Sequence, residues 1–191
     1  MEVQGPQVSG AARGPVRWHC SMSLDGYVAG PNDDMSFLEH VTGDESIIDR
    51  YVEETGAIIA GRRSYDAYAE DPSMKPYGGS WSGRQFVLTH HPEDARPVEG
   101  WTVLGGTLAQ AVDTALDAAR GKAVEIHSAN IASQAIDAGL VDEIHVHIAP
   151  VILGQGVRFF DRPGPGPQVL LERVGAARPS DEVDLIFTPR R

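Results

Sequence analysis

The chain has one cysteine, Cys20, among its 191 residues. An intramolecular disulfide and any cysteine-rich zinc or iron–sulfur site are therefore excluded, and a reducing compartment is expected. Basic residues are also scarce: 16 Lys and Arg stand against 27 Asp and Glu, giving a formal net charge of −11. Because nucleic-acid binding requires clustered basic side chains, we expect no nucleic-acid partner.

Long apolar runs are lacking too. No stretch approaches the roughly 20 residues needed to span a bilayer, so no membrane partner is expected. The first fifteen residues contain no apolar core of the kind that a signal peptide carries, which predicts a cytoplasmic protein. They are small, polar or turn-forming and show no periodicity. This pattern predicts a disordered tail over 1–15 and one ordered domain over 16–191.

The ordered part alternates strand and helix patterns. Short apolar or alternating runs predict strands at 16–22, 57–60, 85–89, 101–104, 124–126 and 143–149. Helical spacing predicts helices at 46–52, 62–70, 107–119 and 130–138. Two further strand-like runs, 169–171 and 183–187, follow without a helix between them. The alternation of strands with helices implies that these strands pair in parallel. The two last runs, with no helix between them, imply an antiparallel edge of the sheet. We therefore expect a three-layer α/β domain with a mixed sheet of about seven or eight strands.

Ligands of such sheets bind at the carboxyl ends of the parallel strands, and the first of these ends carries a carboxylate. Asp25 follows the strand at 16–22 directly and precedes a glycine. A carboxylate in this place can orient a substrate or supply a proton. The alternative is a turn residue without a catalytic role, since aspartate before glycine is frequent in turns.

The strand at 57–60 ends in a glycine followed by two arginines. Gly61 lets the backbone approach a ligand, a helix N-terminus offers unpaired N–H groups, and Arg62 and Arg63 add positive charge. A phosphate group fits this combination. The alternative is a pair of solvated arginines on an exposed first turn. Because cations at a helix N-terminus oppose the macrodipole, we expect an anionic group to compensate for them.

Histidines accompany the remaining strand ends. Two imidazoles follow Thr89, and the segment 127–131 opens a helix with small residues that can present N–H groups to a dinucleotide phosphate. His145 and His147 share one face of a strand and are interpreted as surface or interface residues. With no carboxylate or cysteine in register, these histidines do not predict a metal site, and no metal is expected. The GxGxxG and GxxxxGK[ST] fingerprints are absent.

Taken in order, these strand ends resemble the dihydrofolate reductase-like family, and most closely its riboflavin-biosynthesis reductase branch. The motifs that carry the resemblance are SLDGYVAG at 23–30, GRRSY at 61–65, VLT at 87–89, AGLVDEI at 138–144 and APVILGQG at 149–156, followed by Phe159-Phe160. The resemblance covers about residues 16–187. It implies the dihydrofolate reductase-like three-layer α/β/α fold, with one mixed, mostly parallel sheet and an antiparallel C-terminal edge.

The same resemblance implies an NADPH-dependent reductase that delivers hydride to a C=N or C=O bond of a small polar or heterocyclic substrate. By similarity, Ala29 and its loop line the nicotinamide. The pyrophosphate and the adenosine phosphate are held by Gly61, Arg62, Arg63 and Ser64. Thr89 and His90 lie beside the adenosine ribose with its 2′-phosphate. The pyrophosphate is cradled from the other side by Ser128, Ala129, Asn130 and Ile131.

The family motif favours Asp25 as the proton donor, whereas a looser analogy with folate-specific enzymes points to Asp34 or Glu39. The riboflavin reductase branch also commonly forms dimers. We therefore expect a homodimer that uses the last strands, with His145, His147 and the apolar run 151–153, because this edge looks underprotected.

One departure from the family concerns His127-Ser128, which stands where many relatives carry Gly-Gly. Glycine allows close backbone approach to a cofactor, so this pair can narrow the cleft or replace a backbone contact by a hydroxyl. It motivates one alternative function, a non-catalytic nucleotide-binding protein on the same fold. A second alternative is a reductase that uses a flavin or a deazaflavin.

Overall fold

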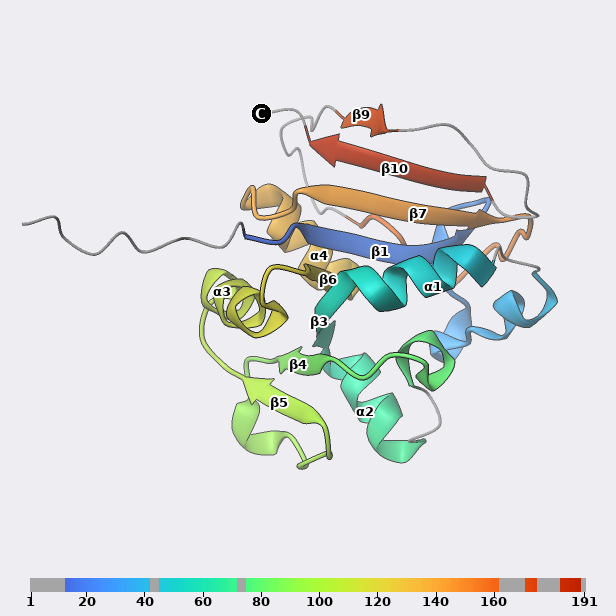
Figure 1. Ribbon diagram of the computed structural model, residues 1–191. Coiled ribbons are helices and arrows are strands. Elements are labelled where there is room, and N and C mark those ends of the chain that lie inside the picture. Colours follow the sequence, from blue (N-terminus) through green and yellow to red (C-terminus); the bar gives the residue numbers. More distant parts are fainter. Residues whose placement is uncertain (1–12, 42–44, 72–74, 162–170, 175–182, 190–191) are drawn as a thin grey trace, which may run out of the picture.

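The computed structural model describes residues 13–41, 45–71, 75–161, 171–174 and 183–189 (Figure 1). The strands of its main sheet are β1 (Val16–Ser23), β3 (Thr55–Gly61), β4 (Arg84–Leu88), β5 (Trp101–Leu104), β6 (Ala123–His127), β7 (Glu143–Ala149), β9 (Leu171–Val174) and β10 (Val183–Pro189). The α-helices are α1 (Glu45–Glu54), α2 (Arg62–Glu70), α3 (Leu108–Ala119) and α4 (Ala129–Asp137). Short 3-10 helices cover Pro31–Asp33, Ser36–His40, Pro76–Gly79 and Pro92–Asp94.

Within these residues the sheet has eight strands in the order β5-β4-β3-β6-β1-β7-β10-β9. Neighbours from β5 to β7 pair in parallel, whereas β10 runs antiparallel to both β7 and β9. The expected mixed, mostly parallel sheet with an antiparallel C-terminal edge is thereby confirmed. Because β1, β3, β4 and β6 are parallel, their carboxyl ends meet at one edge of the sheet.

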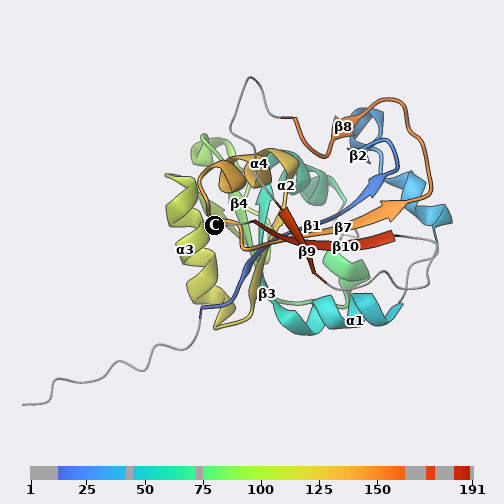
Figure 2. The same cartoon turned by 90° about the horizontal axis from the view of Figure 1, so that it is seen from above.

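The two faces of the sheet differ in chemistry. Val16 and Trp18 of β1 belong to an apolar core that includes the buried residues of α3 and α4. The alternate residues Arg17 and His19 point to the opposite face, which α1 covers, and Tyr51 of α1 stacks on the His19 ring with centroids 3.8 Å apart. Figure 2 shows α1 on one side of the strands and α3 and α4 on the other. Three layers result, as expected.

Helix α3 begins at the predicted capping box. The Thr107 hydroxyl accepts a hydrogen bond from the Gln110 backbone N–H at 3.3 Å, and the Gln110 side chain accepts one from the Thr107 N–H at 3.0 Å. Two N–H groups that lack an intrahelical partner are thereby satisfied. The local sequence alone therefore sets this helix start.

A second, two-stranded sheet pairs β2 (Tyr27–Ala29) with β8 (Val157–Arg158) in antiparallel fashion. It was not predicted, because two or three residues are too few for an alternating pattern to stand out. Gly156, with φ at 136°, makes the pairing possible: a Cβ there would lie 2.0 Å from the Ala29 carbonyl oxygen. The small sheet fixes Ala29 beside the strand ends.

The interpretation of His145 and His147 as surface or interface residues was wrong. Strand β7 lies inside the sheet, between β1 and β10, and the two side chains are 4% and 7% exposed. Alternation along a strand shows which residues share a face but not which element covers that face. Here α1 covers it, and the Tyr51 hydroxyl lies 2.7 Å from His145 Nδ1.

Two expectations fall partly outside the described residues. Of the predicted strand 169–171, Leu171 begins β9, and Val169 and Leu170 lie outside. Of the predicted tail, residues 1–12 lie outside, while the Pro15 carbonyl accepts a hydrogen bond from the Val124 N–H at 2.9 Å. The domain boundary at residue 16 stays a prediction.

Candidate functional site

A cleft of about 1630 Å³ lies where the parallel strands β1, β3, β4 and β6 end. All eleven residues that the resemblance assigns to a cofactor line it: Ala29, Gly61, Arg62, Arg63, Ser64, Thr89, His90, Ser128, Ala129, Asn130 and Ile131. They come from four segments that are far apart in the sequence and that the strand pairing brings together. Their common cleft is a property of the fold, and their role in binding stays a prediction.

Two helix N-termini meet in this cleft. Helix α2 begins directly after Gly61, and α4 begins directly after Ser128. A Cβ on Gly61 would lie only 2.8 Å from the Ser128 hydroxyl oxygen, so glycine permits the close approach of the two helix starts. The first N–H groups of both helices therefore face the same space, an arrangement suited to phosphate oxygens.

Ser128 serves as the N-cap of α4, with its hydroxyl oxygen accepting a hydrogen bond from the Ile131 N–H at 3.4 Å. We expect Ser128→Ala to lower the free energy of unfolding by about 1 kcal/mol, and Ser128→Gly by only a few tenths, because glycine tolerates the N-cap backbone better than alanine. Urea unfolding of the three proteins measures the difference. Equal losses for both variants would contradict a capping role.

The two arginines at the start of α2 have unequal surroundings. The Arg62 guanidinium contacts Asp66 one turn later at 2.8 Å and the Asp94 carbonyl oxygen at 2.9 Å. Arg63, whose side chain is 78% exposed, lies 3.4 Å from the exposed Asp33. Asp66 thus supplies the expected negative charge beside Arg62, and the Arg63 guanidinium is the more accessible of the two to a ligand.

Thr89 and His90 directly follow β4 and line the same cleft. The Thr89 N–H donates to the Leu104 carbonyl at 3.1 Å, and its hydroxyl accepts a hydrogen bond from the His91 N–H at 3.2 Å. His90 is exposed. The turn directly after β4 thus places both side chains at the cleft.

Asp25 lies apart from the residues that line the cleft. Its carboxylate accepts hydrogen bonds from the Ser23 hydroxyl at 2.7 Å and from the Leu153 and Gly154 N–H groups at 3.1 and 2.7 Å. The hydrogen bond from Ser23, with those from the two N–H groups, holds the pKa of Asp25 below its ordinary value. The carboxylate therefore ties the turn after β1 to the 153–154 backbone.

The alternative donors lie outside the lining as well. Asp34 accepts hydrogen bonds from the N–H and the hydroxyl of Ser36, at 2.9 and 3.1 Å, and Glu39 is exposed. A catalytic role for any of the three carboxylates stays a prediction.

Asp25→Asn tests that role for the favoured donor. A purely structural role predicts that the variant loses stability at neutral pH and keeps its catalytic rate. Because the pKa of Asp25 is depressed in the folded state, its contribution to stability is full above the unfolded-state pKa and is lost as the pH falls through the folded-state value. The difference in Tm between wild type and variant should therefore shrink below about pH 4. A rate loss with unchanged Tm would instead support proton donation.

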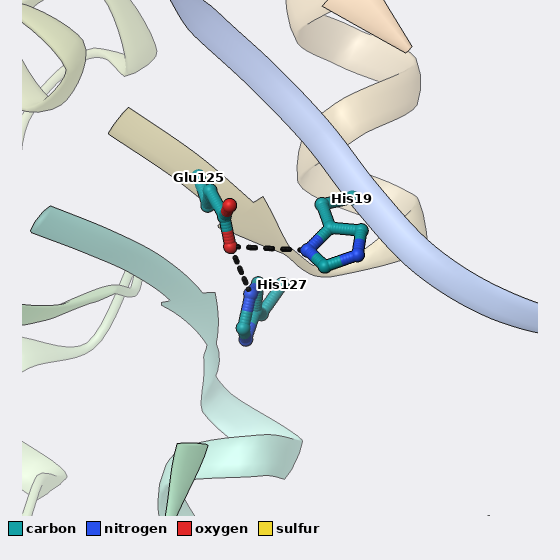
Figure 3. Close-up of side chains that lie close together, drawn as sticks. All are labelled: His19, Glu125 and His127. Carbon is teal, nitrogen blue, oxygen red and sulfur yellow. Dashed lines mark hydrogen bonds and ion pairs between the residues drawn. The ribbon is translucent and has the colours of Figure 1, made fainter. Parts of the chain in front are cut away.

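A buried polar cluster forms the inner wall of the cleft, and sequence analysis missed it. His19 of β1 and Glu125 and His127 of β6 turn toward one another (Figure 3). A single carboxylate oxygen, Glu125 Oε2, lies 3.2 Å from His19 Nδ1 and 3.0 Å from His127 Nε2. Glu125 is completely buried, whereas the His127 side chain is 30% exposed and borders the cleft together with His19.

The signal that could have revealed this cluster is the spacing Glu125-x-His127 on one strand. Residues two apart share a face of a strand, so this carboxylate is in register with a histidine after all. The sequence interpretation weighed the imidazoles after Thr89 and the pair His145 and His147, but not His127, and so overlooked this spacing. The contribution of His19 could not be seen, because only the pairing of β1 with β6 brings it beside Glu125.

Further polar groups surround Glu125. The Thr55 hydroxyl donates to Oε1 at 2.8 Å, Arg17 Nη1 lies 3.7 Å from the same oxygen, and the Tyr77 hydroxyl donates to Oε2. Burial opposes ionisation of Glu125, but His19 and His127 outweigh it and hold the pKa of this carboxyl well below its ordinary value. Burial lowers the pKa of His19 to about 4. The carboxylate is thus ionised and His19 neutral at pH 7.

A second group of polar side chains continues the cluster under α1. The Glu143 carboxylate lies 3.0 Å from His145 Nε2 and 3.0 Å from Arg17 Nε. The hydrogen bond from His145, together with Arg17, lowers the pKa of Glu143 to about 2 despite partial burial. Burial raises the pKa of Tyr51 to about 12 and lowers that of His145. Strands β1, β6 and β7 therefore turn polar side chains toward α1, unlike the apolar face under α3 and α4.

Solved structures share this architecture at low sequence identity. A putative riboflavin biosynthesis protein from Shewanella sp. PV-4 has a TM-score of 0.76 at 19% identity, over 93% of this chain and 99% of that one. Dihydrofolate reductase from Enterococcus faecalis, solved with NADP(H), has a TM-score of 0.61 at 12% identity, over 94% and 98%. These likenesses and the sheet order define a dihydrofolate reductase-like α/β protein.

The chain belongs to the family described as the RibD C-terminal domain, whose model matches residues 15–180. The resemblance to the riboflavin-biosynthesis reductase branch is thereby confirmed. A Thermotoga maritima diaminohydroxyphosphoribosylaminopyrimidine deaminase/5-amino-6-(5-phosphoribosylamino)uracil reductase shares the fold, with a TM-score of 0.63 and 14% identity over 93% of this chain. The chain spans 57% of that protein.

No curated protein sequence matches the chain. None of the described helices is long and apolar enough to cross a membrane.

Proposed function

We propose that the protein is an NADPH-dependent reductase that delivers hydride to a C=N or C=O bond of a small polar or heterocyclic substrate. The observation that carries this proposal is the single cleft in which residues from four strand ends lie together. Membership of the RibD C-terminal domain family supports a reductase. The likeness to a dihydrofolate reductase solved with NADP(H) supports the choice of cofactor.

The residues of the cleft fit a dinucleotide. The N-termini of α2 and α4 offer N–H groups to the pyrophosphate, and Gly61 keeps the two helix starts close together. The exposed guanidinium of Arg63 is available to a further phosphate. When bound, NADPH supplies the hydride. The protein orients the nicotinamide against the substrate and excludes water.

The inner wall of the cleft suits a polar substrate. His19, Ser21 and His147 line it, and imidazoles and a hydroxyl can donate or accept hydrogen bonds with ring nitrogens and carbonyl oxygens. The Thermotoga relative is named for the reduction of a phosphoribosylamino uracil, which is a polar nitrogen heterocycle. We therefore propose a substrate of that chemical class.

Cofactor binding and turnover are tested separately. Isothermal titration with NADPH, and then with oxidised and reduced flavins and deazaflavin, identifies the hydride carrier. Oxidation of NADPH, followed at 340 nm with a panel of carbonyl and imine heterocycles, identifies the reaction. We expect NADPH to bind and to be consumed with a member of the panel. Binding without consumption would favour the non-catalytic alternative, and binding of a flavin or deazaflavin alone would favour the other reductase.

A homodimer stays a prediction, and its expected surface needs correction because β7 is not a free edge. The apolar run 151–153 does reach the surface: Ile152 is 73% exposed and the neighbouring Leu24 64% exposed. The Leu24 N–H donates to the Val151 carbonyl at 2.8 Å, which holds these two side chains in one region. We expect light scattering to give twice 20.5 kDa, and Ile152→Asp to return the mass to 20.5 kDa. A wild-type mass of 20.5 kDa would exclude the dimer.

A further inference from the structure

We propose that His19, Glu125 and His127 form a binding site for one divalent transition-metal ion of the zinc type, set into the inner wall of the cleft. The site supplies two imidazole nitrogens and one carboxylate oxygen. This ligand set occurs in catalytic zinc sites, where the ion keeps an open position for water or substrate. The partial exposure of His127 toward the cleft leaves space for such a position.

The geometry of the three ligand atoms supports the site. They all lie within 4.8 Å of one another, and the two contacts to Glu125 Oε2 measure 3.2 and 3.0 Å. Ligands held about 2.0–2.2 Å from a tetrahedral zinc ion stand roughly 3.3–3.6 Å apart. The two contacts to Glu125 Oε2 in Figure 3 thus lie within a few tenths of an ångström of the separations in a zinc site, and the two imidazole nitrogens lie within 4.8 Å of each other.

The charge balance of the cluster supports a cation. Among the described residues, Arg17 is the one guanidinium within 4 Å of Glu125, and it is shared with Glu54 at 3.1 Å and Glu143 at 3.0 Å. One positive group thus serves three carboxylates, of which Glu125 has no access to water. A buried carboxylate is costly unless it is paired or coordinates a metal. Glu125 is already paired with Arg17, His19 and His127, and a divalent ion would add positive charge at the most buried of the three carboxylates.

Neighbouring groups are placed to orient the ligands. The Thr55 hydroxyl binds Oε1 of Glu125, and Oε2 faces the two histidines and the Tyr77 hydroxyl. The Tyr77 hydroxyl, which also lies 2.9 Å from His19 Nδ1, would have to give up these contacts to an ion. His19 presents Nδ1 to Glu125, and its other nitrogen, Nε2, lies 2.8 Å from His147 Nε2. Metal-binding histidines and carboxylates are characteristically held by such hydrogen bonds on the side away from the ion. Thr55 and His147 are therefore positioning residues.

The role of the ion rests on the proposed function. During reduction of a carbonyl, hydride passes with its electron pair from NADPH to the carbonyl carbon, and the π electron pair moves onto the oxygen. An ion held by His19, Glu125 and His127 would offset the negative charge that grows on that oxygen, and a solvent water would supply the proton. The proton then need not come from Asp25, Asp34 or Glu39, none of which belongs to the lining of the cleft.

Metal binding itself is the test. The full-length protein is stripped with a chelator, and zinc is titrated in competition with a chromophoric chelator. We expect one zinc ion per chain, and cobalt(II) should give the visible absorption of a site with four or five ligands. His127→Ala, which alters the least buried ligand, should weaken zinc binding by more than 100-fold. Thr55→Val should weaken it by about 10–100-fold, as typical for a residue that orients a ligand.

A matched control separates this site from another histidine cluster. His91, Glu93 and Asp94 also lie close together, but all three are exposed. His91→Ala should leave zinc binding unchanged. The proposal is overturned if wild type binds less than stoichiometric zinc, if His127→Ala binds as wild type does, or if His91→Ala loses the ion. Glu125→Gln is a further variant, and the His127 result decides the matter even if Glu125→Gln fails to fold.

Titration of NADPH into the stripped protein distinguishes this inference from the proposed function. NADPH binding together with a failure to bind zinc would overturn the metal site and leave the reductase standing. Stoichiometric zinc without any NADPH binding would support the metal site and count against the reductase.

Discussion

Replacing Arg62 and Arg63 together by alanine is expected to weaken NADPH binding by roughly 10- to 100-fold, the range that one charge-assisted hydrogen bond contributes. Binding of NADH should change much less, because NADH lacks the 2′-phosphate, and the wild-type preference for NADPH should disappear. If Coulomb attraction is the cause, the loss should shrink at high salt. Titrations of both nucleotides into both proteins, at two salt concentrations, measure these effects.

The single variants sharpen this prediction. Arg62 is already paired with Asp66 and the Asp94 carbonyl, whereas Arg63 is exposed and lies 3.4 Å from Asp33. Arg63→Ala should therefore account for most of the loss. Arg84→Ala serves as the control, because Arg84 is exposed at the start of β4 and lies outside the cleft. Equal affinities for NADPH and NADH in wild type, unaffected by salt, would remove the phosphate site and with it most of the case for NADPH.

Gly156→Ala should be the most disruptive single methyl addition near the cleft. The new Cβ would lie 2.0 Å from the Ala29 carbonyl oxygen, so β8 could no longer pair with β2 in its present register. We expect the free energy of unfolding to fall by about 1–3 kcal/mol, as for overpacked sites, with added backbone strain because φ is positive. NADPH binding should weaken as well, since Ala29 lines the cleft.

Gly154→Ala is the matched control for this clash. Its φ is also positive, at 73°, but a Cβ there would meet no atom within 4 Å. It should show the cost of backbone strain alone and keep NADPH binding. Urea unfolding and nucleotide titration of the two variants separate strain from collision. If both variants behave alike, the close contact between Gly156 and Ala29 is not needed for the shape of the cleft or for NADPH binding.

Local patterns predicted much of the fold. The bounds of α2, β5 and β7 match the predicted ranges 62–70, 101–104 and 143–149. In each, the signal lies in neighbouring residues: α2 follows Gly61 directly, and β5 and β7 are short runs rich in apolar residues. The mixed sheet followed from the order of these elements, since a strand–helix–strand unit favours parallel pairing.

The candidate site was predicted where a motif marks the end of a strand. Gly61, Thr89 and Ser128 were chosen from three separate segments, and the structure brings all three to one cleft. Asp25 carries an equally clear motif but lies outside that lining, because three hydrogen bonds direct its carboxylate to the Ser23 side chain and the 153–154 backbone. A motif shows that a residue ends a strand, but the partners of its side chain depend on a loop more than a hundred positions away.

Periodicity, and turn residues within a few positions of one another, predicted most of the elements, their order and the strand ends, but not the short strands β2 and β8. Which strands are neighbours, and which face α1 covers, depends on the tertiary structure. For that reason His145 and His147, which pattern alone placed at a surface, are buried, and His19 lies beside a carboxylate about a hundred residues away in the chain. Contacts between distant segments depend on which strands pair and in which register, and these pairings join parts of the chain that are far apart in sequence.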